Sequence, residues 1–219
     1  MNFFKIFHAQ WRLFAHLLKS YLSLIYGVWK ISQLSAPIVT IFGGSKMSQD
    51  HAYAKKAHEL GRMLVAHKIS VVTGGGSGIM EAANCGAFES KEPKIYSLGI
   101  SVRGLNDSYH NACTDEIVVV DQLFARKWLL ARYALAFVVF PGGYGTADEL
   151  FEILTLMQTG YLQRIPVVLI GVDYWKDLLS WVKRAEQEKL LFTCDAELIF
   201  VTDDVRDAFE HIQRQSERI

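Results

Sequence analysis

The chain has 219 residues with 23 basic and 23 acidic side chains, so its formal net charge is zero. Hydrophobic residues make up 51% and charged residues 21%, a globular composition that excludes a wholly disordered chain. Zero net charge indicates no bulk attraction to nucleic acid, so no nucleic-acid partner is expected. The balance conceals an asymmetry, because residues 1–49 carry a net charge of +5 and the remaining 170 residues −5. The sequence therefore predicts a basic extension on an acidic body.

Residues 1–36 form the predicted extension, in which Phe, Leu, Tyr and Trp recur at helical spacing. The longest uncharged run, Ser20 to Trp29, has ten residues, whereas a membrane-spanning helix needs about 20. A transmembrane helix is therefore rejected, and a signal peptide is only weakly indicated. We predict an amphipathic helix packed on the body or on a second subunit, with its basic side chains meeting acidic groups there. The alternative is a basic helix lying on an anionic membrane surface.

The three cysteines, Cys85, Cys113 and Cys194, are odd in number and widely spaced. They form no CxxC pair, so neither a zinc site nor a disulfide framework is expected. A reduced, cytoplasmic location fits this pattern best. The histidines show no metal-ligand spacing either, and no metal is predicted.

Residues 37–219 alternate short apolar runs with helical patterns. The predicted strands are Ile38–Phe42, Ile69–Thr73, Ile95–Ile100, Ile117–Val120, Ala136–Phe140, Pro166–Ile170 and Leu198–Val201. The predicted helices cover about 50–67, 78–89, 122–134, 146–159, 174–189 and 203–216. This alternation predicts an α/β fold, a Rossmann-like doubly wound parallel sheet that forms one domain behind the helical extension. The strands are continuous apolar runs, as expected when both faces of the sheet are covered.

Two glycine-dense loops, Thr73–Glu81 and Pro141–Glu149, each lie between a predicted strand and a predicted helix. Ligands of doubly wound sheets bind beyond the carboxyl ends of the strands. Glycines let backbone N–H groups approach an anion, and the helix N-terminus adds unpaired donors, so phosphate is the expected guest. Neither loop is a P-loop or a G-x-G-x-x-G fingerprint. The alternative is that both loops are merely tight turns.

Glu149 and Arg126 are the candidate reactive residues, and each has a structural alternative. Thr146-x-x-Glu149 also fits a capping box, with Thr146 at the N-cap of a helix. A carboxylate beside a phosphate-binding loop is nevertheless electrostatically unfavourable, unless it binds ribose hydroxyls or stabilises a cationic centre on a sugar. Arg126-Lys127 begins a predicted helix. The pair is either solvated, or Arg126 lies in the same cleft, where it neutralises phosphate or stabilises a leaving base.

Three motifs of this chain occur together in one known family. They are Gly-Gly-Gly-x-Gly-Ile-Met-Glu at 74–81, Arg-Lys at 126–127 and Pro-Gly-Gly-x-Gly-Thr-x-x-Glu at 141–149. The combination resembles the LONELY GUY family of cytokinin riboside 5′-monophosphate phosphoribohydrolases, often mislabelled lysine decarboxylases. The resemblance extends from Ile38 to about Trp181, and the segment 140–160 is highly specific. The helix before Pro37 resembles that of the longer bacterial branch.

The resemblance implies hydrolysis of the N-glycosidic bond of a purine riboside 5′-monophosphate, of cytokinin type or AMP, to free base and ribose 5-phosphate without a cofactor. It implies Arg126 and Glu149 as the catalytic pair. The implied substrate-binding residues are Ser45, Gly75, Gly76, Lys127, Gly142, Gly143, Tyr144, Gly145, Thr146 and Thr155. It also implies a homodimer or a higher homo-oligomer. A nucleotide-binding carrier or sensor that uses the same cleft without turnover is the alternative function.

One segment departs from the family pattern. Where relatives of this branch have Leu-Pro-x-Glu-Gln before Asn-Pro-Tyr, this chain reads Val102-Arg-Gly-Leu-Asn-Asp107-Ser108 and then Asn111-Ala-Cys113. Asp107 would stand at the Glu position as a substrate-binding residue, one methylene shorter. That segment lies near the base in relatives, so this chain is expected to differ from them in which base it prefers. The chemistry at residues 126 and 149 is unaffected.

Overall fold

The computed structural model describes residues 3–34, 37–90, 92–105, 111–191 and 198–216. Within these ranges the strands form one parallel seven-stranded sheet in the order β4-β3-β2-β1-β5-β6-β7. The strands are β1 (Ile38–Phe42), β2 (Ser70–Thr73), β3 (Ser97–Val102), β4 (Glu116–Val120), β5 (Ala136–Val139), β6 (Val167–Ile170) and β7 (Ile199–Thr202). The predicted α/β class with a doubly wound parallel sheet is confirmed.

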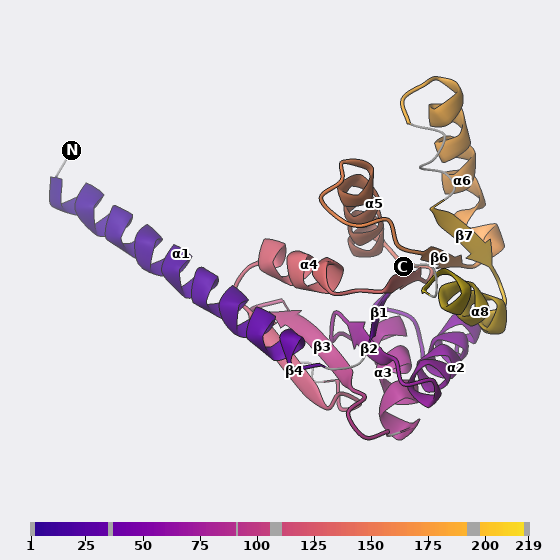
Figure 1. Cartoon of the computed structure of the whole chain (residues 1–219). Helices are drawn as coiled ribbons and strands as arrows, with labels where there is room; N and C mark the ends of the chain where they lie inside the picture. Colours follow the sequence, from indigo (N-terminus) through magenta and orange to yellow (C-terminus); the bar gives the residue numbers. More distant parts are fainter. Residues whose placement is uncertain (1–2, 35–36, 91, 106–110, 192–197, 217–219) are drawn as a thin grey trace.

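Helices cover both faces of this sheet (Figure 1). They are α1 (Phe3–Ser32), α2 (Ala52–Ala66), α3 (Ile79–Ser90), α4 (Leu123–Arg132), α5 (Tyr144–Gln158), α6 (Val172–Gln187) and α8 (Val205–Ser216). One core joins the sheet to α1, α4, α5 and α6, and the other joins it to α2, α3 and α8. In β5, Phe137 contributes to the first core and Val138 to the second. This burial on both faces explains the unbroken apolar runs of the strands.

The strand order reverses between β1 and β5, which lie side by side at the centre of the sheet. Chain connections leave this switch point in opposite directions, so a crevice opens outside the carboxyl ends of the two strands. The turn after β1 and the second glycine loop, which follows β5, both begin there. The fold therefore positions the predicted phosphate loop at the usual ligand site of such a sheet.

Helix α1 buries side chains against the body through its C-terminal half. Ser20, Gly27 and Ile31 are buried, and a Cβ on Gly27 would lie 2.5 Å from Leu129 of α4. Residues 10–19 are all exposed, and the helix projects beyond the sheet (Figure 1). The predicted packing of this helix on the body is thus confirmed for its second half, and in the exposed first half the Nε2 atom of His16 lies 2.6 Å from the side-chain nitrogen of Gln122.

The basic side chains of α1 meet acidic groups of the body, as the charge asymmetry predicts. Lys19 lies 3.8 Å from Asp121, and Lys30 lies 2.6 Å from Glu116. Both pairs lie where α1 crosses β4 and the start of α4. Among the described residues, no helix is both long and apolar enough to cross a bilayer.

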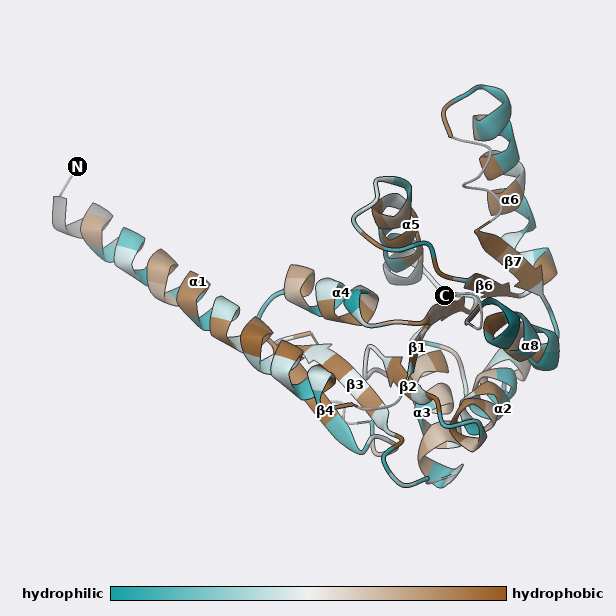
Figure 2. Ribbon diagram, viewed as in Figure 1, coloured by the Kyte–Doolittle hydropathy of each residue, from teal (hydrophilic) through white to brown (hydrophobic). Residues whose placement is uncertain are grey.

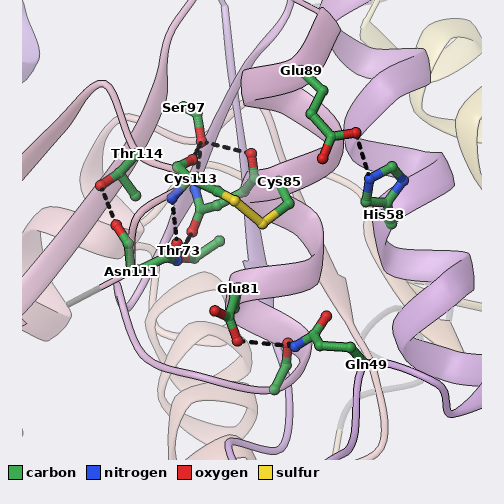
Figure 3. Close-up of a disulfide and its surroundings, with 12 residues drawn as sticks. Gln49, His58, Thr73, Glu81, Cys85, Glu89, Ser97, Asn111, Cys113 and Thr114 are labelled. Carbon is green, nitrogen blue, oxygen red and sulfur yellow. Dashed lines mark hydrogen bonds and ion pairs between the residues drawn. A yellow bond between two sulfur atoms is a disulfide. The ribbon is translucent and has the colours of Figure 1, made fainter. Parts of the chain in front are cut away.

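A disulfide joins Cys85 of α3 to Cys113, with the two Cα atoms 4.6 Å apart (Figure 3). The expectation of no disulfide is therefore wrong. The two cysteines are 28 residues apart in the chain, so their spacing carried no signal. The fold brings them together because buried Asn84, beside Cys85, accepts a hydrogen bond from Asn111 at 3.0 Å. The cytoplasmic location stays a prediction, now without the support of the cysteine pattern.

We expect Cys113→Ser to lower the free energy of unfolding by about 3 kcal/mol, because a closed loop of this length restricts the unfolded chain. Urea denaturation of the variant and of the wild type, with and without dithiothreitol, measures the difference. The reductant should lower the stability of the wild type to that of the variant and leave the variant unchanged. Equal stability of all four samples, with three free thiols titrated in the denatured wild type, would contradict the pairing.

Candidate active site

The second glycine loop presents the N-terminus of α5 to solvent. Helix α5 begins at Tyr144 with Gly143 as its N-cap, and Gly143, Tyr144 and Gly145 are exposed. The first N–H groups of a helix lack acceptors within it, so these groups and the helix dipole favour an anion. The predicted capping box is wrong, because Thr146 and Glu149 both lie inside the helix, where neither caps it.

Gly142 and the turn after β1 fix the shape of this loop. A Cβ on Gly142 would clash with the side chain of Thr146 and lie 2.8 Å from the backbone nitrogen of Gly44. That nitrogen donates a hydrogen bond to the carbonyl of Pro141 at 3.0 Å. The hydroxyl of Tyr174 donates to the carbonyl of Gly142 from the other side. The loop is therefore braced on both sides, while its exposed end stays open to a ligand.

Arg126 and Glu149 form a nearly buried ion pair between α4 and α5. Arg126 Nη1 lies 3.1 Å from Glu149 Oε1, and the two side chains are 12% and 11% exposed. Arg126 Nε donates to the carbonyl of Ile100 in β3 at 3.0 Å, which fixes the guanidinium over the carboxyl end of that strand. The solvated-pair alternative for Arg126 is therefore wrong. Both candidate reactive side chains lie together beside the N-terminus of α5.

Burial raises the pKa of Glu149 to about 7. The Arg126 guanidinium lowers this pKa but offsets only part of the cost of removing the carboxylate from water. The Asp148 carboxylate also raises this pKa, and the Lys127 ammonium lowers it. A carboxyl group that titrates near neutral pH in a ligand crevice can exchange a proton during a reaction, which favours a catalytic role over a purely structural one.

Lys127 lies on the outer side of the same helix pair. Its Nζ lies 2.9 Å from Asp148 and 2.8 Å from Glu152, so it links α4 to α5. Burial lowers the pKa of Lys127, but its hydrogen bonds to these two carboxylates outweigh the effect of burial. The pKa of Lys127 is therefore raised above its ordinary value. The link holds the two helices that carry Arg126 and Glu149 in a fixed relation.

The first glycine loop adds Gly74, which the sequence reasoning missed. A Cβ on Gly74 would clash with the guanidinium of Arg126, so the glycine makes room for the catalytic candidate. Gly75 and Gly78 have φ angles of 68° and 67°, a region that glycine enters without a Cβ penalty. The loop is thus also a tight turn, and Gly76 is buried within it. The sequence signal for this contact was the run of three glycines at 74–76, because the turn itself requires a positive φ only at Gly75 and Gly78.

Comparison with known proteins places this geometry in a family. The model described as "Possible lysine decarboxylase" matches residues 80–212, which include Arg126 and Glu149. The cytokinin riboside 5′-monophosphate phosphoribohydrolase of Rhodococcoides fascians is 30% identical over 176 residues, covering 80% of this chain and 88% of that protein. The chain belongs to the LONELY GUY family. The phosphoribohydrolase LOG4 of Arabidopsis thaliana is likewise 30% identical, over 81% of this chain and 82% of its own.

Solved structures share the fold of this LONELY GUY protein. The molybdenum cofactor carrier protein of Chlamydomonas reinhardtii has a TM-score of 0.60 and 25% identity, covering 82% of this chain and 98% of its own. The molybdenum cofactor binding protein of Rippkaea orientalis has a TM-score of 0.61 at 21% identity, covering 83% and 98%. The second likeness shows the fold alone. The family resemblance predicted from the motifs is confirmed.

One predicted contact of the LONELY GUY site, Thr155, lies apart from the Arg126–Glu149 pair. Thr155 donates to the carbonyl of Phe151 at 2.7 Å and lines an apolar pocket with Trp181, on a different side of α5 from Glu149. Ser45 is exposed at the end of β1, and its carbonyl accepts from Ser77 at 2.7 Å. Asp107 lies outside the described residues. Within the described ranges, no cluster of His, Cys, Asp or Glu could hold a metal ion.

Proposed function

We propose that this protein hydrolyses the N-glycosidic bond of a purine riboside 5′-monophosphate, AMP or a cytokinin-type nucleotide, to free base and ribose 5-phosphate. The observation that carries the proposal is the buried Arg126–Glu149 pair beside the open N-terminus of α5. The names of the relatives from Rhodococcoides fascians and Arabidopsis thaliana support the same reaction. Both AMP and a prenylated, cytokinin-type nucleotide are proposed as substrates.

The 5′-phosphate binds the N–H groups of residues 142–146 and the positive end of the helix dipole. It fixes the sugar one helical turn from Glu149, because that carboxyl group follows Thr146 by three residues. Gly75, Gly76 and Ser45 line the other side of the nucleotide. Binding energy from the unreactive phosphate then supports the chemical step by holding C1′ in place.

The reaction breaks the bond between C1′ and the base nitrogen, and the electron pair leaves with the base. Water supplies the oxygen of the new C1′–O bond, and its proton balances the charge on the base. The ribosyl group is oxocarbenium-like in the transition state, as in glycoside hydrolysis. The Glu149 carboxylate stabilises this cation and accepts the proton of the attacking water, while the Arg126 guanidinium offsets negative charge on the departing base. The chemistry described here needs no metal or organic cofactor.

The alternative is a carrier that binds a nucleotide-like ligand without turnover, which the name of the Chlamydomonas reinhardtii relative suggests. The buried pair favours the hydrolase. A phosphate ligand gains nothing from a buried carboxylate nearby, and burial of that group is costly enough to raise its pKa to about 7. We also propose that the protein acts as a homodimer or a higher homo-oligomer, in the cytoplasm, on a small-molecule nucleotide and with neither nucleic acid nor membrane as a partner.

Purified protein incubated with AMP, isopentenyl-AMP or adenosine tests the reaction, with released base followed by chromatography. We expect base from at least one monophosphate, and at least 100-fold lower kcat/KM for adenosine, which lacks the anchoring phosphate. Equal rates for AMP and adenosine would contradict phosphate anchoring at α5. Absence of base from every purine 5′-monophosphate would exclude the hydrolase and leave the carrier.

The pH dependence of kcat/KM follows from the raised pKa of Glu149. Because the carboxylate is the active form, the rate should fall about tenfold per pH unit below pH 7 and reach a plateau above about pH 8. Substrate phosphate also titrates, near pH 6. The slow Glu149→Gln variant shares that phosphate but lacks the carboxyl group, so its profile should lose the limb near pH 7. An activity that instead falls above pH 7 would show that the protonated carboxyl group is the active form.

A further inference from the structure

Helix α1 carries a regular apolar stripe on the side away from the body. The large side chains of this stripe are about half exposed or more. Single exposed hydrophobic residues are normal on the surface of a monomer, but a long stripe of them is unusual. The stripe consists of Phe7, Trp11, Phe14, Leu18, Tyr21 and Ile25, which are 47–61% exposed. Figure 2 shows hydrophobic residues along this helix well beyond the sheet. We call these six residues the α1 seam.

The spacing of the α1 seam points to a helical partner. Its members follow one another in alternating steps of four and three residues, as positions a and d of a coiled coil do. The body of this protein contacts a different side of α1, through Ser20, Gly27 and Ile31, so the α1 seam is not the face that packs on its own body.

We propose that the α1 seam pairs with the α1 seam of a second copy of this chain. The positions that flank a coiled-coil seam, e and g, are occupied here by His8, Ala15 and Leu22 on one side and by Gln10, Leu17 and Leu24 on the other. None of them is Lys, Arg, Asp or Glu. Two copies of this basic helix can therefore meet without like charges facing each other across the seam.

The charged residues of α1 lie off the seam. Arg12 and Lys19 occupy position b, on the outer side of a paired helix. Lys30 is already paired with Glu116 of the same chain at 2.6 Å and is less available to anionic lipid, while Lys19 is 64% exposed and lies 3.8 Å from Asp121. Charge thus favours a second copy over a membrane surface as the occupant.

The exposed area also suits a stable dimer. The six seam residues and flanking Leu17 and Leu22 are 47–61% exposed, and at about 100 Å² each they offer roughly 800 Å². A standard interface buries about 800 Å² per partner.

Sedimentation equilibrium of the full chain tests the proposal with a matched pair of variants. Phe14→Glu/Leu18→Glu places charges in the seam, whereas Leu13→Glu makes the same type of change at a residue 60% exposed on the same helix but off the seam. All three side chains are exposed in one copy, so the fold of the chain does not depend on them. We expect the wild type and Leu13→Glu to have an even multiple of the chain mass, and the seam variant half that mass.

An unchanged mass for Phe14→Glu/Leu18→Glu, or a monomeric wild type, would overturn the proposal. The membrane alternative is read in parallel, by co-sedimentation with vesicles of phosphatidylcholine and phosphatidylserine. Binding of the wild type to these vesicles that the seam variant loses, with no change in mass between the two, would show that the seam serves a lipid surface. None of these outcomes depends on whether the protein hydrolyses a nucleotide.

Discussion

Glu149→Gln should lower kcat for base release about 1,000-fold and leave the affinity for AMP within a few-fold of the wild type. The amide keeps the size of the side chain but cannot stabilise a ribosyl cation by charge or accept a proton from water. The loss of one preorganised electrostatic contact to a transition state typically costs 100- to 1,000-fold, and here the loss of the base adds to it. Steady-state kinetics for kcat and calorimetric titration of AMP for affinity separate the two effects.

Glu152→Gln is the control for this experiment, because it makes the same chemical change about one turn further along α5. Glu152 contacts Lys127, which keeps Asp148 as a second partner, so activity should stay within about threefold of the wild type. Full activity of Glu149→Gln would mean that the buried carboxyl group is structural. A cap role could not then be invoked, because Gly143 is the N-cap of α5.

Gly74→Ala should lower kcat/KM on the order of 100-fold without a large loss of stability. The added methyl group would clash with the guanidinium of Arg126 and lie 2.9 Å from the sulfur of Met80. Both are the ends of flexible side chains, so the fold can yield, and the guanidinium is displaced from Glu149. A displacement of about 1 Å in a catalytic group is enough for a loss of this size.

The Arg126→Ala background provides the control for Gly74→Ala. If the methyl group acts through the guanidinium, Gly74→Ala should cause no further loss of kcat/KM once Arg126 is removed. Thermal unfolding of each variant checks that the fold persists. A similar loss in both backgrounds would show that Gly74 serves the loop itself, and wild-type activity of the single variant would remove the proposed role.

The strands and helices could be predicted because each residue type agrees with its place in the fold. The run Ile38–Phe42 is buried throughout, and the observed β1 has the same bounds. The start of β3 was placed two residues too early, at Ile95. The strand begins at Ser97, whose backbone N–H is held by the carboxylate of Asp115 at 2.8 Å, a partner 18 residues away that local periodicity does not reveal.

The candidate site was predictable as far as its motifs reach. Arg126 and Glu149 were identified from their neighbours in sequence, and the structure brings them within 3.1 Å of each other. The space that Gly74 leaves for Arg126 depends on a contact between segments some 50 residues apart, which the sequence alone does not show. The Cys85–Cys113 pair and the exposed first half of α1 were missed for the same reason, since each depends on tertiary placement.

The most direct test of the central claim is a mass balance on AMP over many turnovers by the wild-type protein. If the Arg126–Glu149 pair makes this crevice hydrolytic, adenine and ribose 5-phosphate should appear in equal amounts and exceed the protein at least 100-fold, in the presence of a metal chelator. AMP that binds the protein and is recovered intact after the same incubation, with isopentenyl-AMP behaving likewise, would contradict the account.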